Sequence, residues 1–296
     1  MPTVGYIGLG IMGKSIARNI MKAGFPIVVH NRSRTAVKEL VAEGAGEAFS
    51  PAEVASRSDF VFTNLPDSPD VEDVVLGAKG IIDSVRDGQV FVDNSTIKPA
   101  VARKLAAKLI DKGVQALDAP VSGGDIGARD ATLTIMVGGE ESALQTVMPV
   151  FKAMGKTITY VGKSGAGQVA KAANQIMVAA QMVAMGELLI LAQKAGVDPE
   201  KVVEAIKGGA AQCWTLDVKP QRLFSGNRQP GFKARMQAKD LNIVLDTARE
   251  YGIPLPATSE NAQLYTAMLQ MGMADLDNSA VIGVIESLAG IQLSVR

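Results

Sequence analysis

The chain has 296 residues, which suits two domains of ordinary size, and 47% of them are hydrophobic, which is enough for a sizeable core. Thirty basic residues balance thirty acidic ones, so no basic field is available and we expect no nucleic-acid partner. The single Cys213 and the single His30 exclude an internal disulfide, a cysteine-built zinc site and a histidine cluster. We therefore expect no metal, and a protein of the reducing cytoplasm.

The first half of the chain alternates strand and helix patterns. Short apolar runs predict strands in "TVGYIGLG", "PIVVHNR", "DFVFTNLP", "GQVFVDNST", "VQALDAPVS" and "TLTIMVGG". Helical spacing occurs between them in "IMGKSIARNIMKAGF", in "SRTAVKELVAEGA" with Ser33 as a plausible N-cap, and in "KPAVARKLAAKLIDKG". Strands that are apolar on both faces and alternate with helices predict an α/β fold with a parallel sheet covered on both sides.

From about residue 165 the strand signals disappear and only helical patterns follow. We predict long helices over 167–195, 199–208, 234–251 and 256–272. This change predicts a cofactor-binding domain over 1–164 and an all-α domain over 165–296, with the long helix as the joint between them.

The first of these long helices is apolar enough to raise the question of a membrane span. A span would place five polar residues in hydrocarbon: Lys171, Asn174, Gln175, Gln181 and Glu187. We therefore interpret the segment as a buried helix and expect no membrane partner.

A glycine motif stands between the first predicted strand and the first predicted helix. In "YIGLGIMG", Gly8 permits the tight turn, Gly10 lets a pyrophosphate approach the backbone, and Gly13 lets the helix pack closely on the sheet. The helix N-terminus, which includes Ile11 and Met12, offers unpaired N–H groups to phosphates. The motif predicts a Rossmann dinucleotide-binding domain; the alternative is a merely structural glycine turn.

The end of the second predicted strand bears on which dinucleotide is bound. An NAD site usually has a carboxylate there, whereas this chain reads "HNRS", with Asn31, Arg32 and Ser33. No carboxylate would repel a 2′-phosphate, and the guanidinium of Arg32 could bind it. NADP(H) is therefore the preferred cofactor, with NAD(H) also possible; the alternative is an exposed loop arginine.

Four stretches together resemble the β-hydroxyacid dehydrogenase family over the whole chain: "GYIGLGIMG", "DAPVSGGDIGARDATLTIMVGG", "GAGQVAKAANQ" and "QPGFKARMQAKDL". The resemblance implies a Rossmann domain joined by a long helix to an all-α domain. It also implies reversible oxidation of 3-hydroxy acids, or reduction of semialdehydes, with a nicotinamide cofactor. Such proteins are commonly dimers or tetramers, so we expect a homodimer or homotetramer.

Within the family, "IGLGIMGKSIARNIMKAG", "AIKGGAAQ", "QPGF" and "DNSAVI" look most like members that reduce tartronate semialdehyde. Members that reduce succinic semialdehyde and glyoxylate, or that oxidise 3-hydroxyisobutyrate, stay open as alternatives. A catalytically silent NADP-binding scaffold is a further alternative, since fold alone does not assign function.

The resemblance also implies roles for particular residues. It implies substrate binding by Ser122, Gly123, Gly124 and Asn174, with Lys171 as the catalytic lysine. It implies cofactor contacts by Leu65, Pro66, Thr96 and Lys239.

The residues themselves support part of this assignment. Two adjacent glycines after a strand can direct backbone N–H groups at a carboxylate, although a flexible loop is the alternative. Lys171 and Asn174 are three positions apart and so share a helix face. A lysine in a partly dry cleft can donate a proton to a carbonyl oxygen as it becomes an alkoxide. The alternative is a lysine whose head reaches water.

Overall fold

The computed structural model describes residues 1–295, so Arg296, the last residue of the predicted second domain, lies outside the described residues. The chain forms two compact units, Met1–Lys171 and Ala172–Arg296. The division between the units falls within helix α8 (Ala166–Lys194), whose first turns belong to the first unit.

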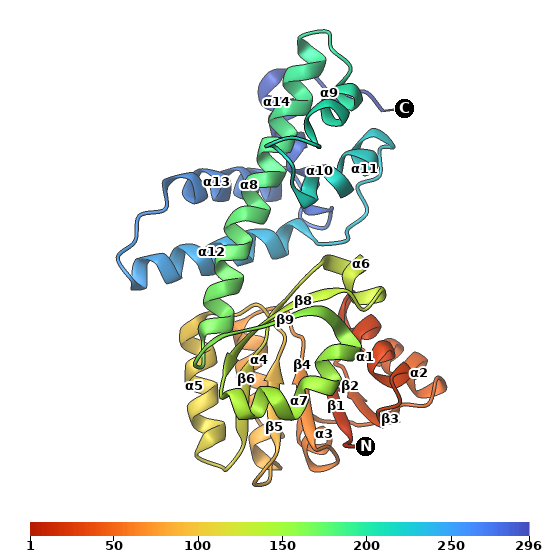
Figure 1. The fold of residues 1–296 in the computed structure, drawn as a ribbon, viewed down its shortest axis with the longest axis vertical. Helices are drawn as coiled ribbons and strands as arrows, with labels where there is room; N and C mark the ends of the chain where they lie inside the picture. Colours follow the sequence, from red (N-terminus) through yellow and green to blue (C-terminus); the bar gives the residue numbers. More distant parts are fainter. Residues whose placement is uncertain (296) are drawn as a thin grey trace. The chain divides into compact units, whose positions relative to one another are not determined.

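The first unit is built on one nine-stranded sheet with the order β3-β2-β1-β4-β5-β6-β8-β7, in which β9 also pairs with β8 (Figure 1). Its strands are β1 (Val4–Ile7), β2 (Ile27–His30), β3 (Gly46–Glu47), β4 (Phe60–Thr63), β5 (Val90–Asp93), β6 (Gln115–Asp118), β7 (Val121–Ser122), β8 (Leu133–Gly139) and β9 (Gly155–Gly162). The run from β3 to β6 is wholly parallel and follows the strand order of a dinucleotide-binding sheet. The predicted α/β fold class is therefore confirmed.

Helices cover both faces of this sheet because its strands are apolar on both faces. The helices of the first unit before α8 are α1 (Gly13–Lys22), α2 (Arg34–Ala42), α3 (Pro51–Ser56), α4 (Ser68–Leu76), η1 (Ile81–Asp83), α5 (Pro99–Ile110), α6 (Gly124–Arg129) and α7 (Glu141–Met154). On one face Phe62 stacks on Tyr6 with ring centroids 6.2 Å apart and meets Phe151 of α7 edge-on at 6.0 Å. On the other face Val61 and Phe91 pack with residues of α3, α4 and α5.

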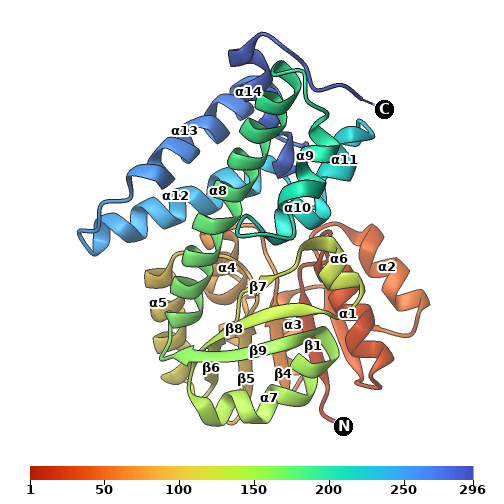
Figure 2. The same cartoon turned by 45° about the horizontal axis from the view of Figure 1, so that its top comes forward.

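The far edge of the sheet differs from the predicted parallel arrangement. β8 runs antiparallel to β6, and the predicted strand "VQALDAPVS" is divided into β6 and β7, with β7 antiparallel to β8. Pro120 lies at the division and has no N–H to continue the ladder. The sequence analysis missed β9, which lies beside β8 (Figure 2) and is largely exposed, so it lacks the doubly apolar pattern of the other strands.

The second unit is all helical. After α8 it contains α9 (Pro199–Ile206), α10 (Trp214–Val218), α11 (Pro220–Phe224), α12 (Ala234–Glu250), α13 (Pro256–Gln270), η2 (Asn278–Val281) and α14 (Ile282–Ala289). The four predicted long helices are confirmed, with ends that differ by two residues or fewer, whereas α10, α11, η2 and α14 were not predicted. Gly186 of α8 allows close packing, because a Cβ there would lie 2.7 Å from the side chain of Ile285.

Helix α8 is the one described helix whose length and hydropathy would allow it to cross a membrane. Half of its most apolar window, 50%, is buried within the protein.

A buried ion pair organises the second unit. Lys219 Nζ lies 2.7 Å from a carboxylate oxygen of Asp277, and both side chains are almost completely buried. Asp277 also accepts hydrogen bonds from the backbone N–H of Gly231 at 2.9 Å and from the Ser279 hydroxyl at 2.6 Å. Burial raises the pKa of Asp277, but the Lys219 ammonium and the hydrogen bonds outweigh it and hold the pKa below its ordinary value.

Replacing Lys219 with Met should lower the free energy of unfolding by about 3–5 kcal/mol at pH 7, because it leaves a buried carboxylate without its partner. A depressed folded-state pKa stabilises the fold above the ordinary carboxylate pKa, and this contribution is lost as the pH falls through the folded value. The deficit of Lys219→Met should therefore shrink below about pH 4, as measured by urea unfolding. Lys233→Met, which breaks an exposed pair with Asp275, should cost less than about 1 kcal/mol. If Lys219→Met lowered the free energy of unfolding equally at pH 7 and below about pH 4, this account of the pair would be contradicted.

Candidate active site

The three glycines between β1 and α1 are required for different reasons. Gly8 has φ +100°, and a Cβ there would lie 2.2 Å from the carbonyl oxygen of Asn64. A Cβ on Gly13 would lie 2.0 Å from the Gly8 oxygen, so this glycine lets the helix close onto the loop. A Cβ on Gly10 would meet no atom within 4 Å. Packing therefore does not explain Gly10, whereas close approach of a ligand to the backbone does.

The N-terminus of α1 is suited to an anion. Met12 is the N-cap residue and its side chain makes no capping hydrogen bond, and the first turn carries no acidic residue. Ile11 before it is 48% exposed. The first N–H groups of a helix have no partner within the helix, and here the Lys14 N–H donates to the Gly10 carbonyl at 3.2 Å. The positive end of the helix dipole still favours a phosphate at this position.

Asn31 has a structural role that the sequence analysis missed. Its side-chain oxygen accepts a hydrogen bond from the backbone N–H of Leu9 at 2.9 Å, and its side-chain nitrogen donates to the carbonyl of Ser33 at 2.9 Å. Asn31 therefore ties the glycine loop to the turn that follows β2. Ser33 occupies the predicted N-cap position of α2, but its side chain makes no capping hydrogen bond.

Two arginines near this turn differ in their partners. Arg34 pairs with Glu47 and lies over the Phe49 ring, with its guanidinium carbon 4.9 Å from the ring centroid. Arg32 is exposed, and no described residue makes a hydrogen bond or ion pair with its side chain. Arg32 is therefore the guanidinium that remains open to a phosphate.

Ser95 joins the loops that follow β4 and β5. Its hydroxyl accepts a hydrogen bond from the backbone N–H of Leu65 at 2.8 Å. Its own N–H donates to an Asp93 oxygen at 3.0 Å, and the Thr63 hydroxyl donates to the same oxygen at 2.8 Å. Leu65, predicted to contact the cofactor, is thus held by this network of hydrogen bonds, and Thr96 is the next residue after Ser95. Burial raises the pKa of Asp93 to about 6.

The predicted contacts also reach the glycine loop. A Cβ on Gly8 would lie 3.1 Å from the side chain of Leu65, so the loop after β4 lies beside the glycine turn. Pro66, the next residue, is exposed. The carboxyl ends of β1, β2, β4 and β5 thus bring together the glycines, Arg32, Leu65 and Thr96, and this arrangement fits a dinucleotide.

The start of α8 is tied to the sheet by side chains that the sequence analysis did not single out. The two oxygens of Asp118 accept hydrogen bonds from the N–H groups of Gly165 at 2.7 Å and Gln168 at 2.9 Å. The Gln168 side chain accepts from the N–H of Ile97 at 3.0 Å and donates to the carbonyl of Ser95 at 2.8 Å. Burial raises the pKa of Asp118 to about 6.

Lys171 follows Gln168 by one helical turn and points back to the sheet. Its Nζ donates to the carbonyl oxygen of Val121 at 2.8 Å, and the residue is only 7% exposed. The structure therefore differs from the alternative in which the Lys171 ammonium reaches water. Ser122 is the next residue after Val121, so the structure brings Lys171 to the start of the Ser122-Gly123-Gly124 segment.

The segment itself differs from the predicted loop. Ser122 ends the short strand β7, and Gly124 already begins α6. Gly123 and Gly124 have φ values of +133° and +64°, which glycine adopts without strain. A Cβ on Gly124 would meet no atom within 4 Å, so its backbone is open.

Asn174 and Lys239 belong to a network in the second unit. Asn174 donates to the side-chain oxygen of Gln175 at 2.7 Å, and Gln175 donates to an Asp240 oxygen at 2.6 Å. The other Asp240 oxygen lies 2.7 Å from Lys239 Nζ. Gln175 and Asp240 therefore connect the two predicted residues. The adjacency of Lys239 and Asp240 was visible in the sequence, but their link to Gln175 was not.

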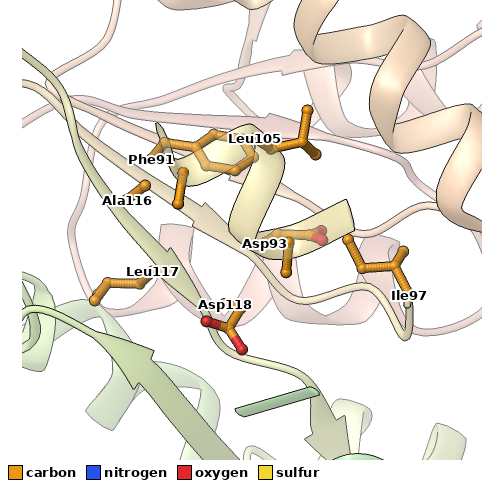
Figure 3. Close-up of a pocket in the computed structure, with 9 residues that line it drawn as sticks. Phe91, Asp93, Ile97, Leu105, Ala116, Leu117 and Asp118 are labelled. Carbon is orange, nitrogen blue, oxygen red and sulfur yellow. The ribbon is translucent and has the colours of Figure 1, made fainter. Parts of the chain in front are cut away.

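A small cavity lies between the sheet and α5 (Figure 3). It has a volume of about 10 Å³ and is lined by Phe91, Leu105, Ala116 and neighbouring side chains. The volume suits about one water molecule, so the cavity is a packing gap and not a substrate site. The described residues contain no group of three or more histidine, cysteine or carboxylate side chains placed to hold a metal ion.

Two family models together match almost the whole chain. The model for the NAD binding domain of 6-phosphogluconate dehydrogenase matches residues 3–162. The model described as NAD-binding of NADP-dependent 3-hydroxyisobutyrate dehydrogenase matches residues 165–285.

Individual relatives agree with these matches. The chain is 40% identical to 2-hydroxy-3-oxopropionate reductase of Escherichia coli over 291 aligned residues. The alignment covers 98% of this chain and 99% of that protein. A structure of 3-hydroxyisobutyrate dehydrogenase from Mycobacterium tuberculosis with L-serine has a TM-score of 0.87 and 34% identity, covering 96% of this chain and 99% of that one. A structure of Psf3 in complex with NADP+ and 2-OPP has a TM-score of 0.88 and 26% identity, and the match covers 95% of this chain and 99% of that one. The chain therefore belongs to the β-hydroxyacid dehydrogenase family and is an NAD(P)-dependent oxidoreductase of hydroxy acids.

Proposed function

We propose that the protein reduces a small carboxylate semialdehyde of the tartronate semialdehyde type to the hydroxy acid, with NADPH as the preferred cofactor. The observation that carries the proposal is Lys171. It is a buried lysine held 2.8 Å from the carbonyl oxygen that precedes Ser122, beside the segment assigned to the substrate carboxylate.

Lys171 acts as the general acid. The cofactor, when bound, supplies a hydride to the aldehyde carbon. The carbonyl π bond breaks as this C–H bond forms, and the oxygen takes up a proton from Lys171 Nζ. Before transfer, the ammonium polarises the carbonyl and stabilises the charge that develops on oxygen. In the oxidative direction the neutral amine removes the hydroxyl proton, so one side chain serves both directions.

The substrate carboxylate is assigned to the Ser122-Gly123-Gly124 segment, with Asn174 as a further contact. Gly124 supports this, because a Cβ on it would meet no atom within 4 Å and its backbone is therefore open. Asn174 lies three positions beyond Lys171 on α8, and its amide is oriented by Gln175. Lys239, oriented by Asp240, is assigned to the nicotinamide end of the cofactor.

The choice of substrate is supported by the Escherichia coli relative, which is a 2-hydroxy-3-oxopropionate reductase. A second candidate is oxidation of 3-hydroxyisobutyrate, which is favoured by the structural likeness to the Mycobacterium tuberculosis dehydrogenase. Succinic semialdehyde and glyoxylate are further candidate substrates of the same site. A panel of these compounds, followed by cofactor absorbance with NADPH and NADH, separates them by kcat/KM. The proposal fails if tartronate semialdehyde is among the poorest substrates.

We further propose a cytoplasmic homodimer or homotetramer. Helix α8 leaves Met177 58% exposed and Leu191 72% exposed, and burial of such side chains against a second copy would be favourable. Sedimentation at micromolar concentration should give a dimer or larger species, and a monomer would contradict the proposal.

Lys171→Ala should lower kcat by at least about 10²–10⁴-fold, because it removes the general acid. NADPH affinity should change little, since the glycine loop and Arg32 are untouched. Lys171→Arg should not restore activity, because a guanidinium holds its proton too tightly and has a different shape. The measurement is kcat with saturating NADPH, together with NADPH binding by fluorescence.

Lys194→Ala is the matched control for this experiment. Lys194 lies at the other end of α8 and also donates to a backbone carbonyl, that of Ala289 at 2.6 Å. Its replacement should leave kcat near the wild-type value. Retention of more than about a tenth of kcat by Lys171→Ala would remove the lysine from the mechanism, because a general acid contributes more than that.

Arg32→Ala should raise the KM for NADPH by about ten- to a hundredfold, as expected for loss of a charge-assisted contact of roughly 1.5–3 kcal/mol. The KM for NADH should change far less, because NADH lacks the 2′-phosphate. Arg34→Ala is the control, since Arg34 is already paired with Glu47. Equal use of both cofactors by the wild-type protein would defeat the proposed preference.

A further inference from the structure

We infer that Asp93 and Asp118 are positioning residues for this reaction, with Asp93 fixing the two loops assigned to the cofactor and Asp118 fixing the helix start that carries Lys171. The inference rests on the proposed function of Lys171 and of the cofactor loops, and it assigns two residues that do not themselves contact substrate or cofactor.

The two carboxylates occupy neighbouring positions in the sheet. Asp93 ends β5 and Asp118 ends β6, and they are register partners in this parallel pair. Both side chains lie on the face covered by α5, at the edge of the same small cavity (Figure 3). The carboxyl ends of parallel strands are where such sheets hold ligands, so both residues lie directly beneath the site.

Asp93 uses one oxygen for positioning. Its Oδ1 accepts from the Ser95 N–H and the Thr63 hydroxyl, and Ser95 in turn holds the Leu65 backbone. The other oxygen, Oδ2, is buried and has no hydrogen-bond partner among the described residues. An amide in place of this carboxylate can therefore keep the accepting oxygen where it is needed.

Asp118 uses both of its oxygens. Each accepts a backbone N–H at the start of α8, from Gly165 and from Gln168. An amide in this place would turn one N–H₂ group toward an N–H donor, which opposes the native contact. Lys171 lies one turn further along the helix, so a shift of the helix start displaces its Nζ from Val121.

The charged and titratable neighbours of the pair come from three elements. Tyr6 of β1 lies near Asp93, and burial raises the pKa of this phenol, so it stays neutral. Arg103 of α5 lies against Gly165, one of the donors to Asp118. Lys171 of α8 lies one turn beyond Gln168, the other donor to Asp118. Burial raises the pKa of both carboxyls to about 6, and the charge of Asp118 adds to this effect at Asp93.

This arrangement has a consequence for the pH dependence of the reaction. Protonation of Asp118 replaces one accepting oxygen by an O–H that faces a backbone N–H, so the helix start loosens. The wild-type kcat in the reductive direction should therefore fall as the pH is lowered through about 6. Lys171 cannot cause such an acid limb, since the reduction uses its protonated form.

The experiment compares four variants at saturating and varied NADPH. Asp118→Asn should lower kcat by about 10–100-fold at pH 7.5, as expected for a misplaced catalytic group, and its kcat should lose the acid limb. Asp93→Ala should raise the KM for NADPH by about tenfold, because it removes the oxygen that accepts from Ser95 and Thr63, whereas Asp93→Asn keeps that oxygen and should rescue most of this loss. Gln89→Ala is the matched control.

Gln89 is buried and donates to the carbonyls of Ala55 and Ser58, just before the start of β5 and therefore at the far end of the strands. Its replacement should lower the melting temperature without changing kcat or KM. A merely structural role for Asp93 and Asp118 predicts the same pattern for their variants, and that pattern overturns the inference.

The outcomes separate the inference from the proposed function. A wild-type kcat that stays flat from pH 8 to pH 5, while the circular dichroism is unchanged, overturns the role of Asp118 even if Asp118→Asn does not fold. Equal KM values for Asp93→Ala and Asp93→Asn overturn the role of Asp93. If the wild-type protein turns over none of the candidate substrates, the proposed function fails instead, and NADPH binding by the Asp93 variants still tests the cofactor loops.

Discussion

The hydrogen bonds at the start of α8 are the constraint on which the rest of the site depends. A helix begins with N–H groups that have no partner in the helix, and here a carboxylate from the sheet accepts two of them. Gln168 then links the same turn to the loop after β5. Because a helix is rigid over one turn, these contacts determine where Lys171 lies. The buried ammonium is thereby held on the Val121 carbonyl, and Val121 immediately precedes the segment assigned to the substrate.

The cofactor side of the site follows from a second constraint, which is close backbone approach. Neighbouring backbone atoms leave no room for a Cβ at Gly8 or Gly13, whereas the space beside Gly10 is open. Asn31 contributes differently from the carboxylate usual at this position, because its side chain bonds the backbone of the glycine loop. Arg32 stays unengaged by the described residues, while Arg34 is held by Glu47. The same short segment thus combines a structural asparagine with an arginine that is available to an anion.

Much of the fold could be predicted from the sequence, because strong apolar periodicity identifies a strand or a helix from its own local sequence. The doubly buried strands β1, β2, β4 and β5 and helices α9 and α12 are of this kind, whereas α8 and α13 were predicted from long stretches without strand signals. The exposed strand β9 and the short helices α10 and α11 carry no such pattern and were missed. In the site, the glycine motif was readable from local chemistry, whereas the roles of Lys171 and Ser122 came from a family resemblance. Asp118 and Gln168 could not be assigned, because their partners lie 47 to 73 positions away along the chain.

The central claim is that the Lys171 ammonium delivers a proton, and chemical rescue of Lys171→Ala tests this most directly. Primary alkylamines added to the variant should restore part of kcat, with a rate that varies with the pKa of the amine, as general acid catalysis requires. Tetramethylammonium carries the same charge without a proton and should restore nothing. Activation that is equal with tetramethylammonium, or that is absent with every amine, would contradict a proton-donating role for Lys171.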